Sequence, residues 1–139
     1  MFERCLYFNT QNLARTVERL WTEEFKQYDL SPAHAYLLRL VLAEPGLLQR
    51  DIAQQLGLSK STVTRFIDSL AERGYVSRKY SNSDGRESVI YPERKALAIH
   101  KQLEASGAKL YKRMVAALGE DTMQAAVAQQ RKIREALQG

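Results

Sequence analysis

The sequence is poor in the residues that carry most metal and redox chemistry. Its 139 residues include one cysteine and two histidines. A lone cysteine, Cys5, cannot form a disulfide within the chain. His34 and His100 lie far apart in the sequence without a neighbouring cysteine or carboxylate cluster, so each is better read as a surface, partly buried or pocket-lining residue. We therefore expect no intrachain disulfide, no metal site and no cofactor.

Signals for membrane insertion and export are also missing. No apolar run approaches the roughly 18 residues that a membrane-spanning helix needs. The N-terminus does not show the basic block followed by an apolar block that is typical of a signal peptide. These absences predict a cytoplasmic protein that has no membrane partner.

Proline and glycine are scarce, with three and seven residues. Hydrophobic residues make up 45% and charged residues 27% of the chain, which is ordinary for a globular protein and excludes disordered or fibrous chains. The length suits one domain. A formal net charge of +5 favours polyanionic partners, although charge alone is weak evidence for them.

The sequence offers no recognisable catalytic constellation. We find no nucleophile paired with a base, no carboxylate pair suited to a cleft and no glycine loop that would cradle a phosphate. The sequence therefore predicts that the protein is not an enzyme.

The apolar spacing at the N-terminal end predicts two helices. Over residues 3–28 apolar side chains recur on one face of a helix. Ser31 is suited to cap a second helix whose first turn holds Pro32, and this helix ends before Pro45 and Gly46.

The C-terminal part is also predicted to be helical. A long helical region starts at Pro92 and continues to about Leu118, interrupted at most by Gly107, and a last helix opens at Glu120 or Asp121. The terminal helices have too few other elements of the same chain to pack against, so their apolar stripes would stay partly exposed in a single copy. Pairing with the same helices of a second copy is the natural remedy, so we expect a homodimer.

Residues 48–73 fit a helix-turn-helix. Counted from Gln49, the small Ala53 is fifth, where two steeply crossed helices meet, and Gly57 is ninth, where the turn requires positive φ. Val63 is fifteenth. The core beneath the two helices is expected to comprise Ile52, Leu56, Leu58, Val63, Phe66, Ile67 and Leu70.

The second helix of this pair is a candidate DNA-recognition helix. Hydroxyl and cationic side chains crowd its start, and such groups suit phosphate oxygens and base edges in the major groove. By itself, a polar, solvated face explains the pattern equally well, but its combination with the turn and the following hairpin favours DNA binding. The candidate residues are Ser59, Lys60, Ser61, Thr62, Thr64 and Arg65.

A hairpin follows the helix pair. Residues 75–80 and 88–91 alternate like strands around a polar loop that contains Asp84, Gly85 and Arg86. Arg86, oriented by Asp84, could enter a minor groove, whereas an isolated Asp-Gly turn would more simply carry an incidental surface arginine. Arg78 and Lys79 would add phosphate contacts or keep the strand soluble.

These motifs resemble the MarR family of bacterial winged helix-turn-helix regulators. The resemblance is carried by residues 49–53 (QRDIA), 58–65 (LSKSTVTR) and 73–76 (RGYV), by Leu70, and by the pair Asp84 and Arg86. Two positions depart from the family pattern: Leu48 stands where a capping threonine is common, and Lys95 where a glycine often follows the wing.

The resemblance implies a mainly α fold with a small β-hairpin wing. It implies a single domain over residues 1–139, with dimerisation helices at 1–30 and 93–139 around a winged helix-turn-helix lobe at 31–92. It further implies a homodimer that reads a pseudo-palindromic operator in double-stranded DNA, commonly as a repressor that a small ligand or an oxidant releases.

Two sensor sites are candidates. Cys5 lies about where the hydroperoxide-sensing branch of the family carries its reactive cysteine, although a lone cysteine is more often an inert small hydrophobe. Aromatic side chains would line a pocket for a small-molecule effector or belong to the ordinary core. These aromatic residues are Trp21, Phe25, Tyr36 and Phe66.

The alternative to a DNA-binding regulator is a winged-helix module that binds proteins and not DNA, because a fold does not dictate its function. The cationic side chains of Lys60, Arg65 and Arg86, together with Thr64, speak for DNA.

Overall fold

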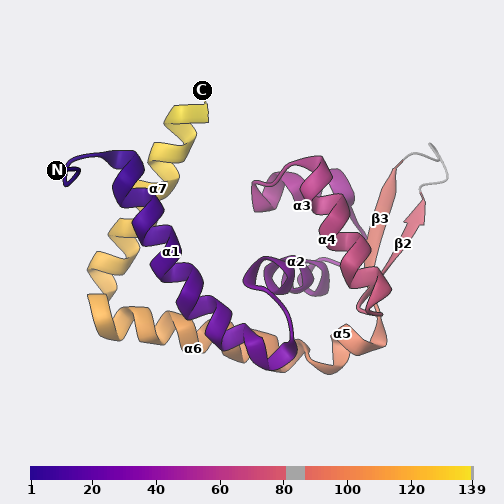
Figure 1. Cartoon of the computed structure of the whole chain (residues 1–139). Helices are drawn as coiled ribbons and strands as arrows, with labels where there is room; N and C mark the ends of the chain where they lie inside the picture. The colour runs from indigo at the N-terminus through magenta and orange to yellow at the C-terminus, as the bar shows by residue number, and fades with distance from the viewer. Residues whose placement is uncertain (81–86, 139) are drawn as a thin grey trace. The chain divides into compact units, whose positions relative to one another are not determined.

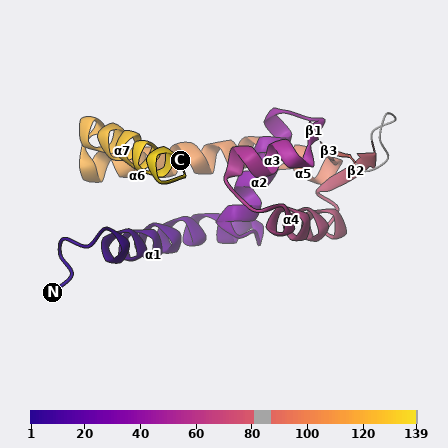
Figure 2. The ribbon, with the colours of Figure 1, turned by 90° about the horizontal axis from the view of Figure 1, so that it is seen from above.

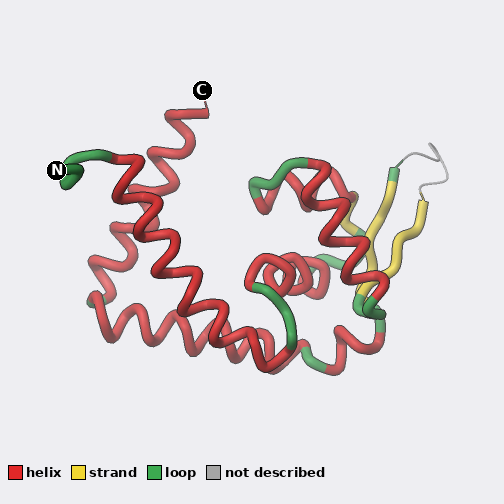
Figure 3. Tube along the Cα trace, in the orientation of Figure 1, coloured by secondary structure: helices red, strands yellow, loops and turns green. Residues whose placement is uncertain are grey.

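A computed structural model of the chain describes residues 1–80 and 87–138 (Figure 1). Its internal contacts divide the chain into two compact units, Met1–Glu104 and Ala105–Gly139. Helix predominates in both, and within the described ranges every strand belongs to the first unit (Figure 3).

The first unit begins with the two predicted helices. Helix α1 spans Leu6–Phe25 and continues into a short 3-10 helix, η1, at Lys26–Tyr28. Helix α2 spans Pro32–Ala43, and the Ser31 hydroxyl accepts the backbone N–H of His34 at 3.1 Å. The predicted cap and the predicted end before the Pro-Gly pair are confirmed.

The helix-turn-helix is formed by α3, Gln49–Leu56, and α4, Lys60–Glu72. Gly57 lies between them in the left-handed region at φ 66°, which a residue without Cβ adopts without strain. Ala53 is buried, as a close helix crossing requires, and Ser59 caps α4 by accepting the N–H of Thr62 at 3.2 Å.

A three-stranded antiparallel sheet follows the order β1-β3-β2. The predicted hairpin consists of β2, Val76–Tyr80, and β3, Ser88–Pro92. The short β1, Leu47–Leu48, was not predicted, because two apolar residues show no alternation; Leu47 pairs with Ile90. In the view from above, the sheet lies beside the helix-turn-helix (Figure 2).

The expected single helical region after the hairpin is wrong in two details. Pro92 ends β3 and does not start a helix, and α5, Arg94–Ala98, is separate from α6, His100–Leu118. The break falls at Ile99, whose N–H bonds three residues back to Ala96. Gly107 lies inside α6, because a single interior glycine costs a helix only about 1 kcal/mol.

The core of the first unit is formed mainly by α2, α3, α4 and the inner face of the sheet, with further buried side chains from α1 and from the start of α6. Most of its helical side chains come from positions that the helical spacing marked as apolar; Leu38 was not among them, and Ile90 lies in a strand. The largest side chains with no exposed surface are Phe25, Leu37, Leu38, Val41, Ile52, Val63, Ile67, Leu70, Ile90 and Leu103.

Helix α1 exposes apolar side chains that the spacing marked for burial. Leu13 is 50% exposed and Leu6 56%, whereas Phe25, at the other end of the helix, is fully buried. The apolar stripe of α1 is therefore exposed in its N-terminal half and partly covered at Val17 and Leu20.

The second unit ends with α7, Glu120–Gln138, which begins where the sequence predicted. None of the residues in this helix is buried. Ile133 is 38% and Leu137 75% exposed, so α7 also presents an uncovered apolar stripe.

Among the helices that the structure describes, none combines the length and the apolarity needed for a bilayer crossing. In residues 1–80 and 87–138, no three histidine, cysteine or carboxylate side chains gather closely enough to hold a metal ion.

Candidate nucleic-acid interface

Helix α4 has one face in the core and one in solvent. Val63, Ile67 and Leu70 are fully buried beneath it. The predicted DNA-contacting side chains lie on the other side, with Thr62 half-buried and the rest exposed; the exposed ones are Ser59, Lys60, Ser61, Thr64 and Arg65. The structure therefore gathers these six residues at one accessible end of the helix.

The hydroxyl groups at the start of α4 form a small network. The Ser59 hydroxyl donates to Thr62 Oγ1 at 2.8 Å and lies 3.2 Å from the Ser61 hydroxyl. Arg65 reaches Thr62 Oγ1 from one turn later, at 3.5 Å, a distance at which a hydrogen bond is weak. The guanidinium of Arg65 is therefore held loosely and is available to an anion.

Thr64 connects α4 to α3. Its hydroxyl donates to the Lys60 carbonyl at 2.9 Å and accepts from the Gln49 side-chain amide at 2.7 Å. Gln49 was not among the predicted site residues. Its place at the first position of α3 brings it beside α4, a proximity that follows from the crossing of the two helices.

Arg78 is bound within the protein. Its guanidinium forms an ion pair with Asp68 at 2.5 Å, donates to the Thr64 carbonyl at 3.3 Å and reaches Gln49 Oε1 at 3.5 Å. The side chain is 22% exposed. Its predicted phosphate contact remains a prediction, but the observed partners indicate a residue that joins β2 to both helices.

Lys79 differs from its neighbour. It is exposed, and its ammonium lies 4.9 Å from the centre of the Tyr91 ring. Because alternate residues of a strand point to opposite faces, the two cations that the sequence grouped together have different surroundings. Lys79 is the one placed to meet an anion in solvent.

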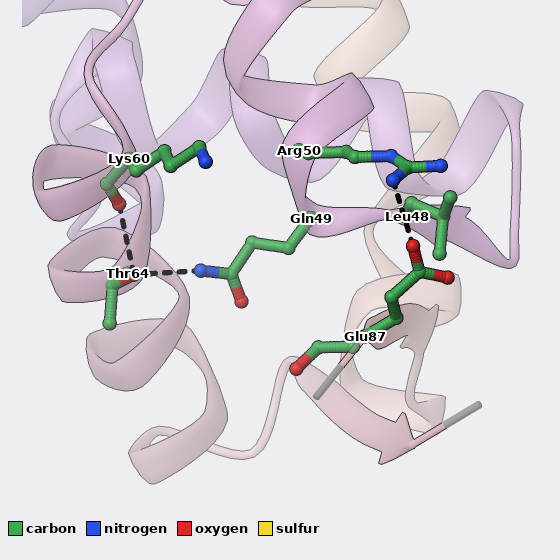
Figure 4. A pocket seen from close by; sticks show the side chains of 7 residues that line it. Leu48, Gln49, Arg50, Lys60, Thr64 and Glu87 are labelled. Carbon is green, nitrogen blue, oxygen red and sulfur yellow. Dashed lines mark hydrogen bonds and ion pairs between the residues drawn. The ribbon is translucent and has the colours of Figure 1, made fainter. Parts of the chain in front are cut away.

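A groove of about 340 Å³ lies between the starts of α3, α4 and β3 (Figure 4). Arg50, from α3, forms an ion pair at 2.8 Å with Glu87, the residue before β3. Neither was predicted as a site residue, since a pair 37 positions apart leaves no local signal in the sequence. The lining residues are Leu48, Gln49, Arg50, Lys60, Thr64, Glu87 and Ser88.

The start of α3 borders this groove without a capping side chain. Its N-cap residue is Leu48, whose apolar side chain makes no capping hydrogen bond. This agrees with the departure in the sequence, in which Leu48 stands where the MarR family commonly has a capping threonine. The predicted wing-tip residues Asp84 and Arg86 lie outside the described residues.

The other departure, Lys95, has a structural role. Its ammonium donates to the Arg73 carbonyl at 2.9 Å and lies 4.5 Å from the centre of the Tyr75 ring. It thereby attaches α5 to the segment between α4 and β2.

Three of the four predicted pocket aromatics lie together. The Trp21 indole donates to the Tyr36 hydroxyl at 3.0 Å, and Phe25 meets Tyr36 edge to face at 5.8 Å between ring centres. Phe66 packs elsewhere, at 4.3 Å from the His34 ring. The pocket prediction for Phe66 therefore has no support from this cluster.

Charged groups extend the aromatic cluster. The Arg39 guanidinium lies 4.8 Å from the centre of the Tyr36 ring and donates two hydrogen bonds to Glu104, at 3.0 and 3.1 Å. This bidentate bond raises the pKa of Arg39 and lowers that of Glu104, so both stay ionised.

His34 joins the start of α2 to α4. Its Nδ1 lies 2.6 Å from the Ser31 hydroxyl, and its ring packs against Phe66. Burial, with a smaller contribution from the positive charge of Arg73, lowers the pKa of His34, so it stays neutral to lower pH than a free histidine. Such a histidine is expected to serve packing.

Cys5 is the N-cap residue of α1 and is half-buried. Its carbonyl accepts a hydrogen bond from the Asn9 side chain at 2.8 Å. Its predicted redox role stays a prediction.

The family model described as "MarR family" matches residues 28–87, which contain the helix-turn-helix and β2 and end just before β3. The HTH-type transcriptional regulator YfiV of Bacillus subtilis is 30% identical over 102 residues, which are 73% of this chain and 64% of that protein. The chain spans 63% and 64% of the length of the curated relatives that it matches.

Two solved structures extend the similarity to nearly the whole chain. The PcaV regulator of Streptomyces coelicolor, in complex with its natural ligand, superposes with a TM-score of 0.87 at 25% identity, over 99% of this chain and 96% of that one. The transcriptional repressor CouR, bound to a 23-mer DNA duplex, gives 0.86 at 25% identity over 96% and 94%. With its helix-turn-helix and the paired strands β2 and β3, the chain has the winged-helix fold of these MarR-family structures and is similar to the MarR family in sequence.

Proposed function

We propose that the protein is a sequence-specific DNA-binding transcriptional regulator that represses genes as a cytoplasmic homodimer and is not an enzyme. The observation that carries this proposal is the exposed start of α4. There, Lys60, Thr64 and Arg65 project from a helix whose opposite face is fully buried. The DNA-bound repressor CouR, which superposes on the chain, supports it.

The geometry suits a major groove about 12 Å wide, into which one helix fits. Hydroxyl groups on α4 can bond to phosphate or base edges, and Arg65 can reach a guanine. The hairpin beside it is then placed toward the adjacent minor groove. In this proposal the wing residues Asp84 and Arg86 keep the minor-groove role that the sequence suggested.

The proposed dimer follows from the apolar stripes of α1 and α7. Each unit leaves one such stripe in solvent, and a second copy of the chain can cover both. In this arrangement residues 1–30 and 93–139 form the dimer contacts. Two-fold symmetry then sets two α4 helices on the half-sites of a pseudo-palindromic operator.

Arg65→Ala tests the role of α4. We expect the affinity for the intergenic duplex upstream of the protein's own gene to fall by about 1–3 kcal/mol, because a base or phosphate contact is lost. The melting temperature should stay unchanged, since Arg65 is exposed. Lys60→Ala should act in the same direction. Arg94→Ala, which removes an exposed arginine from α5, is the matched control, and its dimer is checked by ultracentrifugation because Arg94 lies in the proposed dimer range.

Binding is measured by fluorescence anisotropy between 50 and about 200 mM salt, a range over which several phosphate contacts cost several orders of magnitude in affinity. If both α4 variants bind as the wild type does, α4 is not the reading element. If the wild type binds neither this duplex nor other genomic DNA, a protein-interaction module becomes the better description.

We further propose that a small ligand or an oxidant releases the DNA. PcaV, which was solved with its natural ligand, supports the ligand. Trp21 and Tyr36, which pack over the buried Phe25 and lie beside Arg39, offer aromatic and cationic surface. Cys5 is the candidate for the oxidant.

One release assay separates the two signals. Preformed protein–DNA complex is treated with a phenolic carboxylate or with an organic hydroperoxide. Release by hydroperoxide that a thiol reductant reverses and Cys5→Ser abolishes would assign the signal to Cys5. Release by the carboxylate that Tyr36→Ala weakens would assign it to the aromatic cluster, and a complex stable to both would remove both candidates.

A further inference from the structure

The groove between α3, α4 and β3 contains an ion pair that the proposed DNA contacts leave unused. Arg50 and Glu87 meet at 2.8 Å, and their side chains are 62% and 32% exposed. Water screens such a pair, so its net contribution to stability is small and either partner can be exchanged.

The position of this groove relative to the DNA follows from the proposed function, on which this inference rests. With α4 in a major groove and the hairpin in the adjacent minor groove, the sugar-phosphate strand that separates these grooves passes between the two elements. The groove is lined by Lys60 and Thr64 from α4 and by Glu87 and Ser88 at the start of β3. A phosphate of that strand therefore lies over it.

A phosphate in this place meets charges of both signs. Arg50 and Lys60 attract it, whereas the Glu87 carboxylate repels it and occupies the guanidinium that would bind it. In Figure 4, Lys60 points from α4 toward Gln49, whereas Gln49 and Arg50 leave the start of α3 in opposite directions, Gln49 toward Thr64 and Arg50 toward Glu87. Gln49 is held by Thr64, so the arginine is the group that is free to change its partner.

We propose that Arg50 is a phosphate-binding residue whose guanidinium is paired with Glu87 in the DNA-free protein. In the free protein the carboxylate of Glu87 binds the guanidinium; on DNA, a phosphate oxygen replaces it. Glu87 acts through Arg50 as a positioning residue. It keeps the arginine at the groove, and its charge lowers the affinity for every duplex.

The substitution Glu87→Gln tests the proposal because it is expected to increase, and not to decrease, the affinity for DNA. This change removes the competing charge and keeps the shape, so DNA should bind about two- to fivefold more tightly at low salt. Arg50→Gln should bind more weakly, and the slope of log K against log salt should become shallower by about 0.9, the value for one phosphate contact.

The gain from Glu87→Gln should shrink in the double variant Arg50→Gln/Glu87→Gln, because the released guanidinium is then missing. Glu72→Gln, which removes an exposed carboxylate at the far end of α4, controls for the change in net charge. All variants are measured as full-length chains on the same upstream duplex, with melting temperatures recorded beside the affinities.

Tighter binding by Glu87→Gln that depends on Arg50 would support the exchange. Weaker binding by Glu87→Gln, an unchanged salt slope in Arg50→Gln, or an equal gain with and without Arg50 would each overturn it while leaving the proposed function intact. A wild-type protein that binds no DNA would overturn both.

Discussion

A chain shortened to end at Leu118 is expected to lose its dimer and, with it, at least about 100-fold of its affinity for the operator. The missing helix, α7, carries an apolar stripe of which no residue is buried in the single chain, so a second copy is its proposed cover. A monomer binds one half-site, and the gain from two linked half-sites is about 10²–10⁴. Analytical ultracentrifugation and anisotropy titration measure the two losses.

Because the shortened chain could misfold, a full-length point variant tests the same interface independently. Ile133→Asp places a charge in the apolar stripe of α7, whereas Ala128→Asp adds the same charge on the opposite side of the helix. We expect the first to dissociate the dimer and the second to leave it intact. A stable dimer in both the shortened chain and Ile133→Asp would show that α7 is not part of the interface.

Arg78→Ala is expected to cost about 1–3 kcal/mol of unfolding free energy and to weaken DNA binding as well. The guanidinium joins β2 to Asp68 on α4 and to Gln49 on α3, and its removal leaves the carboxylate of Asp68 without this partner. Strand β2 and helix α4 then lose a connection that fixes their relative position.

Lys79→Ala is the matched control, since it removes the neighbouring but exposed cation of the same strand. It should leave the unfolding free energy nearly unchanged and lower DNA affinity modestly. Unfolding in urea at one protomer concentration gives the stabilities, because dimerisation contributes to them. Weaker DNA binding by Arg78→Ala at wild-type stability would instead make Arg78 a direct phosphate contact.

The parts of the fold that were predictable are those encoded by residues close together in the sequence. Ser31 and Ser59 cap the helices that they precede, and Gly57 has the positive φ that the turn demands. The exposed face of α4 was predictable for the same reason, because a helical period separates it from Val63 and Ile67.

The features that were missed depend on contacts between distant residues. Strand β1 is defined by the pairing of Leu47 and Leu48 with β3, which lies much later in the sequence. The break between α5 and α6 falls at Ile99, where no glycine or proline signals the end of a helix. The ion pairs of Arg50 and Arg78 could not be predicted from the sequence either, because their partners, Glu87 and Asp68, come from other parts of the fold. A surface cation and a cation committed to an internal ion pair are identical in sequence.

The central claim, that this chain reads DNA, is tested most directly by salt titration of the purified protein against two duplexes of equal length: the region upstream of its own gene and a shuffled sequence of the same composition. The account predicts tight, salt-sensitive binding to the first and binding weaker by about 10³-fold or more to the second. Equal affinity for the two, or no binding to either, would contradict it.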